Sequence, residues 1–254
     1  MYELYDTEAQ RRCADIVRDN SSQIERSPEK ELKSDRDAQI KFLIPLMKRN
    51  SEIGTLKNIF YQVAFRLGLC TNTFVQYYFL MSDRQYRYLI SLPSKNLKLY
   101  RSETVLYNTL FTINHLGTYD LREDFGLSLH TIQRAKHTET DVHLVHMKPR
   151  EDIICRFDPS FMAEFRFFVV QGMFHPTRRV ATFIRSWFDI SEKDCAHIGI
   201  HKKTRIGDMT KEQFLLLFCF LRDLPYYKDT TFVSAAKQSE ESLGYLDQIS
   251  NTGS

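Results

Sequence analysis

The sequence predicts a mainly α-helical protein with one to three helix-turn-helix units and at most one short β-hairpin. Three observations lead to this fold class. Apolar residues recur mostly at the three- and four-residue spacing of helices. Two stretches share the same pattern of apolar residues around a glycine, at Gly68 and Gly126. Only the runs Val142–His146 and Ile153–Phe157 have strand-like composition, and a proline-containing polar turn separates them.

Taken in order, the elements divide the chain into four regions. Residues 1–40 are expected to form an N-terminal helix and a polar loop, because Arg18–Gln39 carries almost no large apolar side chain. Residues 41–137 are expected to be helical and to contain the two repeats. A second helical region with the short hairpin should cover residues 138–233, and a disordered tail residues 234–254. The apolar groups behind the helices are Phe42, Leu43, Leu46 and Met47, then Ile59, Phe60, Val63, Ala64 and Leu67, and finally Phe214, Leu217, Phe218 and Leu221.

The composition is that of an ordinary globular protein, with 254 residues, 43% hydrophobic residues, 26% charged residues and a net charge of +3. It permits a polyanionic partner without demanding one. The five cysteines are scattered and form no CxxC pair, which favours reduced thiols in a cytoplasmic protein. No secretory signal or membrane span is expected. A homo- or hetero-oligomer without metal or cofactor is the prediction for the assembly.

Residues 121–137 carry the pattern of a helix-turn-helix. Gly126 suits the positive φ that the turn between the helices requires. Leu121, Phe125, Leu127 and Ile132 fall at inward positions, and Ser128 can cap the second helix. The outward positions of that helix are polar and basic, which suits contacts to base edges in the major groove.

The upstream stretch of residues 63–79 repeats this pattern with Gly68 in the turn and Ala64 at the close approach of the helices. A third, weaker echo covers residues 183–198, with Asp189 in the turn. The outward residues of the 63–79 copy carry no positive charge, so packing or a partner contact is the stronger interpretation there. If that copy is a second DNA-binding unit, its contacts are Thr71, Asn72, Thr73 and Gln76.

The motif around Gly126 resembles the helix-turn-helix of bacterial transcription regulators. Arg122 departs from that pattern, which usually has alanine four positions before the glycine. A looser likeness, over residues 120–190, is to the C subunit of the flagellar master activator and its mobile-element relatives, without their four-cysteine zinc site. The resemblance implies a sequence-specific regulator bound to double-stranded DNA. The expected contacts are Ser128, His130, Thr131, Gln133, Arg134, Lys136, His137, Lys148, Arg150, Arg178, Arg179, Lys202, Lys203 and Arg205.

The alternative interpretation is a non-catalytic helical adaptor or assembly subunit, in which the same hairpins only pack. Two loose groups of candidate metal ligands, Cys195 with His197 and His201, and His143 with His146 and Cys155, lack the paired spacing of zinc sites. No glycine-rich phosphate loop, serine elbow or HExxH motif is present, so no enzyme is expected. A nuclease whose acidic residues are dispersed along the chain would carry none of these motifs.

Overall fold

The computed structural model describes residues 40–45, 49–70, 75–93, 98–127, 140–190, 200–201 and 203–241. The chain divides into two compact units. The sheet unit comprises Met1–Ile59, Gly68–Tyr86 and Phe111–Pro149, and the helical unit comprises Phe60–Leu67, Arg87–Leu110 and Arg150–Ser254. Within the described part of the chain, no helix combines the length and the apolarity needed to cross a bilayer.

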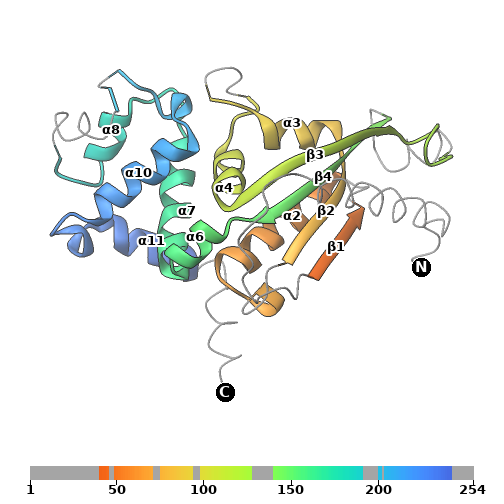
Figure 1. Cartoon of the computed structure of the whole chain (residues 1–254). Coiled ribbons are helices and arrows are strands. Elements are labelled where there is room, and N and C mark those ends of the chain that lie inside the picture. Colours follow the sequence, from red (N-terminus) through yellow and green to blue (C-terminus); the bar gives the residue numbers. More distant parts are fainter. Residues whose placement is uncertain are drawn as a thin grey trace. The chain divides into compact units, whose positions relative to one another are not determined.

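The sheet unit is built on four strands in the order β1-β2-β4-β3 (Figure 1). Strand β1 (Ile40–Pro45) pairs in parallel with β2 (Val75–Ser82). Strand β4 (Asp141–Pro149) runs antiparallel to both β2 and β3 (Phe111–Asp120). Helices α2 (Arg49–Ala64) and α3 (Asp83–Ile90) begin in the sheet unit and end in the helical unit, with the short helix η1 (Gly68–Cys70) after α2.

The mixed sheet corrects the expected mainly α fold. Seven of the eight residues of β2 are buried, and β4 is buried from Val142 to Met147. Central strands covered on both faces read as continuous apolar runs, and they lack the alternation that identifies a half-exposed strand. A continuous apolar run also matches the inward positions of a helix. For this reason the residues of β2 were assigned to the second helix of the 63–79 motif, and that prediction is wrong.

A β-bulge interrupts strand β3 between His115 and Gly117. His115 pairs with Val145 and Gly117 with Leu144, so Leu116 is the extra residue. One inserted residue changes which face each later side chain occupies. A β-carbon on Gly117 would lie 3.0 Å from the ring of Tyr119, so a larger residue here would require that ring to move.

The helical unit consists of α4 (Ser102–Leu110), α6 (Glu151–Arg156), α7 (Pro159–Met173), α8 (Val180–Arg185), α10 (Lys211–Arg222) and α11 (Thr231–Glu241), with the short helices η2 (Ile206–Asp208) and η3 (Tyr227–Asp229). Its core is a cluster of phenylalanine rings. Phe168 of α7 contacts Phe218 of α10 at 5.4 Å between ring centroids and Phe232 of α11 at 6.2 Å. The predicted helix around Phe214–Leu221 is confirmed as α10.

Local sequence signals fix where these helices begin. The Asp158 carboxylate accepts a hydrogen bond from the Phe161 N–H at 2.6 Å, and Pro159 occupies the first helical position of α7. Helix α10 starts with a capping box, in which the Thr210 hydroxyl and the Gln213 side chain each accept from the other's backbone N–H. The buried Arg166–Glu240 ion pair, 3.0 Å long, ties α7 to α11.

The helix expected before Gly126 is absent, because Phe111–Asp120 forms strand β3. The expected second helix, with Ile132, lies outside the described residues. After β3 the chain makes one helical turn over Leu121–Phe125, which Asp120 caps by accepting from the N–H groups of Arg122 and Glu123. Gly126 does hold the expected positive φ, at 68°, but it ends that single turn. The Leu127 N–H returns to the Leu121 carbonyl at 3.0 Å, which is the Schellman arrangement.

The neighbouring predictions need the same correction. Leu121 and Phe125 are buried as expected, but they pack in a cluster with Leu80, Val142 and Leu144 of the sheet. Gly68 also has a positive φ, of 56°, yet the chain continues into β2 and not into a second helix. The predicted β-hairpin is half right, since Val142–His146 lies in β4 whereas Ile153–Phe157 falls in and after helix α6.

Candidate functional site

Many of the residues expected to contact DNA lie outside the described residues. These are Ser128, His130, Thr131, Gln133, Arg134, Lys136, His137, Lys202, Thr71, Asn72 and Thr73. Gln76 is buried in strand β2, where its side-chain oxygen lies 2.9 Å from the ring of His146, so it is not available to a base. Lys148 lies within strand β4, and Arg150 directly precedes helix α6. They therefore do not lie in the polar turn of a β-hairpin, where the sequence placed them.

The structure brings together three of the predicted basic residues, Arg178, Arg179 and Arg205. Arg179 and Arg205 form an isolated antiparallel β-bridge. Three backbone hydrogen bonds hold the two segments side by side, from Val180 N to Thr204 O at 3.0 Å, from Ile206 N to Arg178 O at 2.9 Å, and from Gly207 N to Pro176 O at 2.8 Å. We call Arg178, Arg179 and Arg205 the arginine cluster.

Buried apolar residues adjoin the arginine cluster in the sequence and hold its backbone in place. Val180 is fully buried, and Ile206 is 1% exposed. The side chains of the three arginines are exposed, and among the described residues none of them forms an ion pair. Like charges placed opposite each other on paired strands destabilise the pair by roughly 0.2–1 kcal/mol. Repulsion between like charges that no carboxylate of the described residues relieves is typical of a functional surface.

An exposed aromatic ring precedes the arginine cluster along the chain. Phe174 follows the last residue of α7 and is 76% exposed, the largest value among the large hydrophobic side chains of the described chain. Its backbone N–H donates to Val170 O at 3.1 Å, which fixes its place at the end of the helix. The ring of His175 meets it edge to face at 4.8 Å, and a turn closed by Arg178 N to His175 O leads directly into the cluster.

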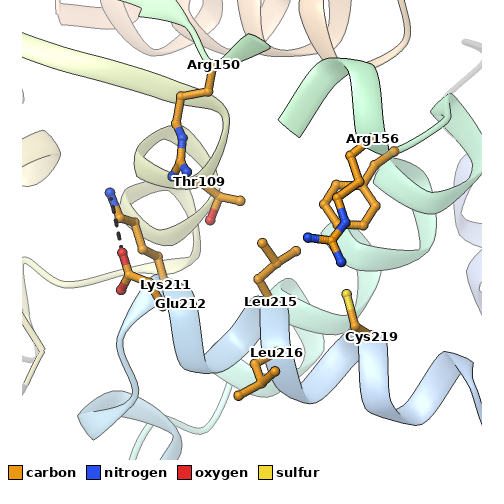
Figure 2. A pocket seen from close by; sticks show the side chains of 9 residues that line it. Thr109, Arg150, Arg156, Lys211, Glu212, Leu215, Leu216 and Cys219 are labelled. Carbon is orange, nitrogen blue, oxygen red and sulfur yellow. Dashed lines mark ion pairs between the residues drawn. The ribbon is translucent and has the colours of Figure 1, made fainter. Parts of the chain in front are cut away.

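A separate pocket of about 200 Å³ lies in the helical unit between residues of α4, α6 and α10. Figure 2 shows the side chains of Arg150, Arg156 and Leu215 directed toward the same space. Its floor is apolar, with Phe157, Leu215 and the exposed Leu216. Burial raises the pKa of the Cys219 thiol, which also lines the pocket, while the charge of Arg156 acts in the opposite direction.

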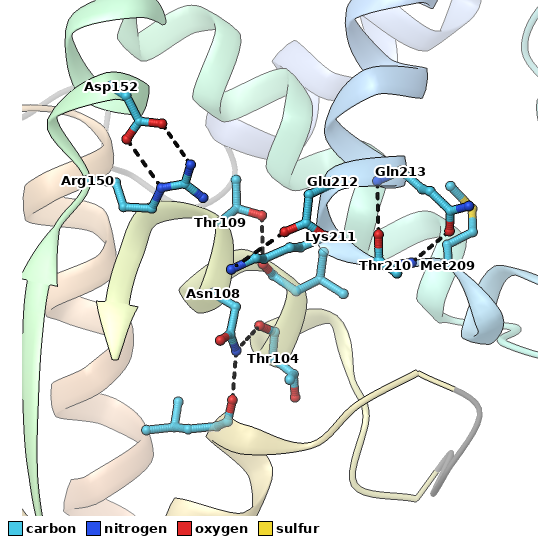
Figure 3. A network of polar contacts seen from close by, with 12 residues as sticks. Thr104, Asn108, Thr109, Arg150, Asp152, Met209, Thr210, Lys211, Glu212 and Gln213 are labelled. Atoms are coloured by element: carbon cyan, nitrogen blue, oxygen red, sulfur yellow. Dashed lines mark hydrogen bonds and ion pairs between the residues drawn. The ribbon is translucent and has the colours of Figure 1, made fainter. Parts of the chain in front are cut away.

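Carboxylates neutralise most of the charge of this pocket (Figure 3). The Arg150 guanidinium donates to both oxygens of Asp152, at 3.2 and 2.7 Å. Lys211 lies 3.7 Å from Glu212. Arg156 forms no ion pair among the described residues, and its guanidinium lies over the Phe157 ring at 5.2 Å. The pocket can hold a small, weakly anionic group, whereas the arginine cluster has the stronger uncompensated charge.

Sequence reasoning identified the three arginines one by one, but it missed both their pairing and Phe174. Pairing across Arg179 and Arg205 depends on contacts distant in sequence. Phe174 had one available signal, because His175-Pro176 follows it and marks the end of the helical apolar run. Within the described part of the chain, no three histidine, cysteine, aspartate or glutamate side chains are grouped to hold a metal ion.

Comparison with known proteins gives a likeness of fold only. No family model and no curated protein matches the chain. Among solved structures, it is similar to the 23S rRNA methyltransferase ErmE, with a TM-score of 0.48, 11% identity, and coverage of 76% of this chain and 68% of that one. It is also similar to a dimethyladenosine transferase from Plasmodium falciparum, with a TM-score of 0.47, 10% identity, and coverage of 74% and 67%.

The mixed sheet corrects several of the expectations from sequence. The resemblance to helix-turn-helix regulators and to the flagellar activator subunit is wrong, because the described residues of the motifs that follow Gly68 or surround Gly126 belong to strands and to a single turn. The predicted regulator of transcription and its double-stranded DNA partner depended on that motif, and the helical adaptor depended on an all-helical fold. The mixed sheet removes the basis for all three. Both solved structures bear the names of transferases, and the expectation of a non-enzyme is not carried further.

Proposed function

We propose that the arginine cluster and Phe174 bind unpaired stretches of RNA. The observation that carries this proposal is the Arg179–Arg205 bridge, which fixes uncompensated positive charges on two paired segments. Arginine contacts phosphate with two parallel N–H groups, and contacts to the phosphate backbone supply much of the affinity for nucleic acids. The strand of RNA would replace the missing carboxylates as the partner of these charges.

Phe174 selects unpaired bases over a duplex. A ring that is 76% exposed offers one flat face for stacking, and bases inside a duplex are already stacked on their neighbours. Unpaired bases are typical of RNA loops, bulges and ends, where proteins stack them on aromatic side chains. A base on Phe174 would place the adjoining phosphates toward the turn that leads to Arg178.

Arginine and phenylalanine contacts respond differently to salt, so the test separates them. Affinity of the full chain for a fluorescent single-stranded RNA is measured by anisotropy over a range of salt concentrations. Arg179→Ala and Arg205→Ala should each weaken binding and reduce the slope of log affinity against log salt by about 0.7. Phe174→Ala should weaken binding by about 1–3 kcal/mol at every salt concentration and leave the slope unchanged.

Matched controls exist on the same chain. Lys237→Ala removes an exposed positive charge from α11, and Ile53→Ala removes an exposed apolar side chain from α2. Neither should change binding. Equal losses in Lys237→Ala and Arg179→Ala would show that only the net charge matters, and tighter binding to a duplex than to the single strand would refute the role of Phe174. A single-stranded DNA of the same sequence tests whether the 2′-hydroxyl contributes.

A further inference from the structure

A second group of polar side chains gathers in the sheet unit and shares no residue with the proposed RNA-binding surface. It consists of His115 and Thr118 of β3, His143 of β4, and Asp83 and Tyr86 of α3. The bulge at Leu116 brings it together, because His115 and Thr118 would point to opposite faces of a regular strand. With the extra residue, both side chains reach His143, and Gly117 keeps the bulge free of a clash with Tyr119.

Three donor atoms form a nearly equilateral triangle. His115 Nε2 lies 3.2 Å from His143 Nδ1, Thr118 Oγ1 lies 3.2 Å from His115 Nε2, and Thr118 Oγ1 lies 3.1 Å from His143 Nδ1. Ligands of a tetrahedral zinc ion at bonds of about 2.0–2.1 Å are roughly 3.3 Å apart. The three atoms therefore stand close to the positions that one face of such a tetrahedron requires.

When both imidazoles are neutral, two hydrogens serve the three contacts of this triangle. His143 Nε2 lies 3.0 Å from Asp83 Oδ1, so the one ring hydrogen of His143 is given to the carboxylate and its Nδ1 presents a lone pair. The three contacts then share at most two hydrogens, one from Thr118 and one from His115. In the tautomer of His115 without a hydrogen on Nε2, all three atoms present a lone pair, and one bound cation can contact all of them.

The surroundings of the triangle are those of a histidine-bound metal ion. Metal-ligating histidines usually donate their other ring N–H to a carboxylate or carbonyl, which fixes the tautomer and orients the ring. Asp83 fulfils this role for His143, whose side chain is 9% exposed. The ring of Tyr86 stacks on His143 at 4.3 Å and lies against His115 at 4.9 Å, which limits the rotation of both imidazoles. His115 and Thr118 are both exposed, so an ion and its water ligand can reach the site.

We propose that His115, His143 and Thr118 form a site for a divalent transition metal of the zinc class, oriented by Asp83 and completed by water. Imidazole nitrogens suit zinc, and two of them with the hydroxyl leave an open position like that of zinc sites with three protein ligands. This inference concerns the sheet unit only and does not depend on RNA binding.

The test is zinc binding by the full chain, first treated with chelator and then dialysed against zinc chloride. We expect one zinc ion whose binding is lost in His115→Ala, a substitution at an exposed position that should fold. Asp83→Asn should weaken binding by about 10- to 100-fold, because the orienting carboxylate is lost. His175→Ala removes an exposed imidazole from the helical unit and should leave zinc binding unchanged.

Cobalt provides an independent readout, since a tetrahedral Co²⁺ site with nitrogen and oxygen ligands differs in visible absorption from a thiolate site. Loss of the cobalt spectrum in His115→Ala, with a circular dichroism spectrum like that of the parent, supports the proposal. Equal zinc binding by the parent and His115→Ala would overturn it, as would a thiolate spectrum or no saturable binding. Thr118→Val, which removes the hydroxyl and nearly keeps its shape, should lower affinity less than His115→Ala.

Discussion

His146 should make the stability of the sheet unit depend on pH. Its side chain is buried in β4, stacked on Tyr78 at 4.7 Å, and its Nε2 lies 2.9 Å from Gln76 Oε1. Because an amide oxygen only accepts, Nε2 carries the hydrogen. His146 Nδ1 has no hydrogen-bond partner among the described residues. Protonation would bury a second N–H without an acceptor, which costs free energy.

The magnitude follows from the shifted pKa. Burial, and then the positive charges of Lys148 and Lys41, lower the pKa of His146 to about 4 from an ordinary value of 6.5. The unfolded chain therefore binds a proton at higher pH than the folded one, and stability is complete above about pH 6.5 and lost as the pH falls toward about 4. Each pH unit in this interval is worth about 1.4 kcal/mol, so the whole interval is worth roughly 3 kcal/mol.

Urea unfolding followed by circular dichroism measures this loss. Between about pH 7 and about pH 5, the parent should lose about 2 kcal/mol more stability than His146→Gln, which cannot titrate in this range. The variant loses the stacking on Tyr78 at every pH, so the comparison uses the difference between two pH values and not the absolute stability. His115 remains in both proteins, and its contribution cancels. Equal losses in parent and variant would refute the assignment to His146.

Two further substitutions test the packing of each unit by urea unfolding. Glu240→Ala should cost about 3–5 kcal/mol, because it leaves the buried Arg166 guanidinium without its carboxylate, whereas Ala at the exposed neighbour Glu241 should change little; similar costs for both would contradict a buried ion pair. Gly117→Ala should cost about 1–3 kcal/mol through overlap with the Tyr119 ring, while Gly54→Ala, with no atom near the added carbon, should be neutral or stabilising. A neutral Gly117→Ala would mean that the bulge adjusts easily.

The sequence predicted the conformation of single residues better than it predicted the elements that join them. Gly68 and Gly126 hold the positive φ expected of them, because the absence of a side chain is a local property. The element after each glycine depends on the sheet, which forms from segments distant in the chain. Strand β2 was taken for a helix since its buried residues show no alternation, and the periodic α10 was recognised from its four inward apolar residues.

At the candidate sites, too, the sequence predicted the types of residue but not where the fold places them. Arg178, Arg179 and Arg205 were singled out as cations, but the bridge that joins them comes from backbone pairing across the segment between Arg179 and Arg205. His143 was considered as a metal ligand only with His146 and Cys155. His146 is its near neighbour along β4 but contacts Gln76, while the bulge in β3 supplies His115. No spacing rule in one strand could have revealed a partner whose face depends on an inserted residue.

The two proposed sites have one physical property in common. Each holds polar groups that could bind more partners than the neighbouring residues provide. Among the described residues the arginine cluster forms no ion pair, and in the histidine triangle two hydrogens serve three contacts. A fold keeps such arrangements when the backbone around them is strongly determined, here by paired segments in one unit and by strands β3 and β4 in the other. Because the missing ligands differ in charge, each site should reject the other's ligand. Any effect of zinc on RNA affinity would then be a coupling between sites, and RNA would have to change zinc affinity by the same factor.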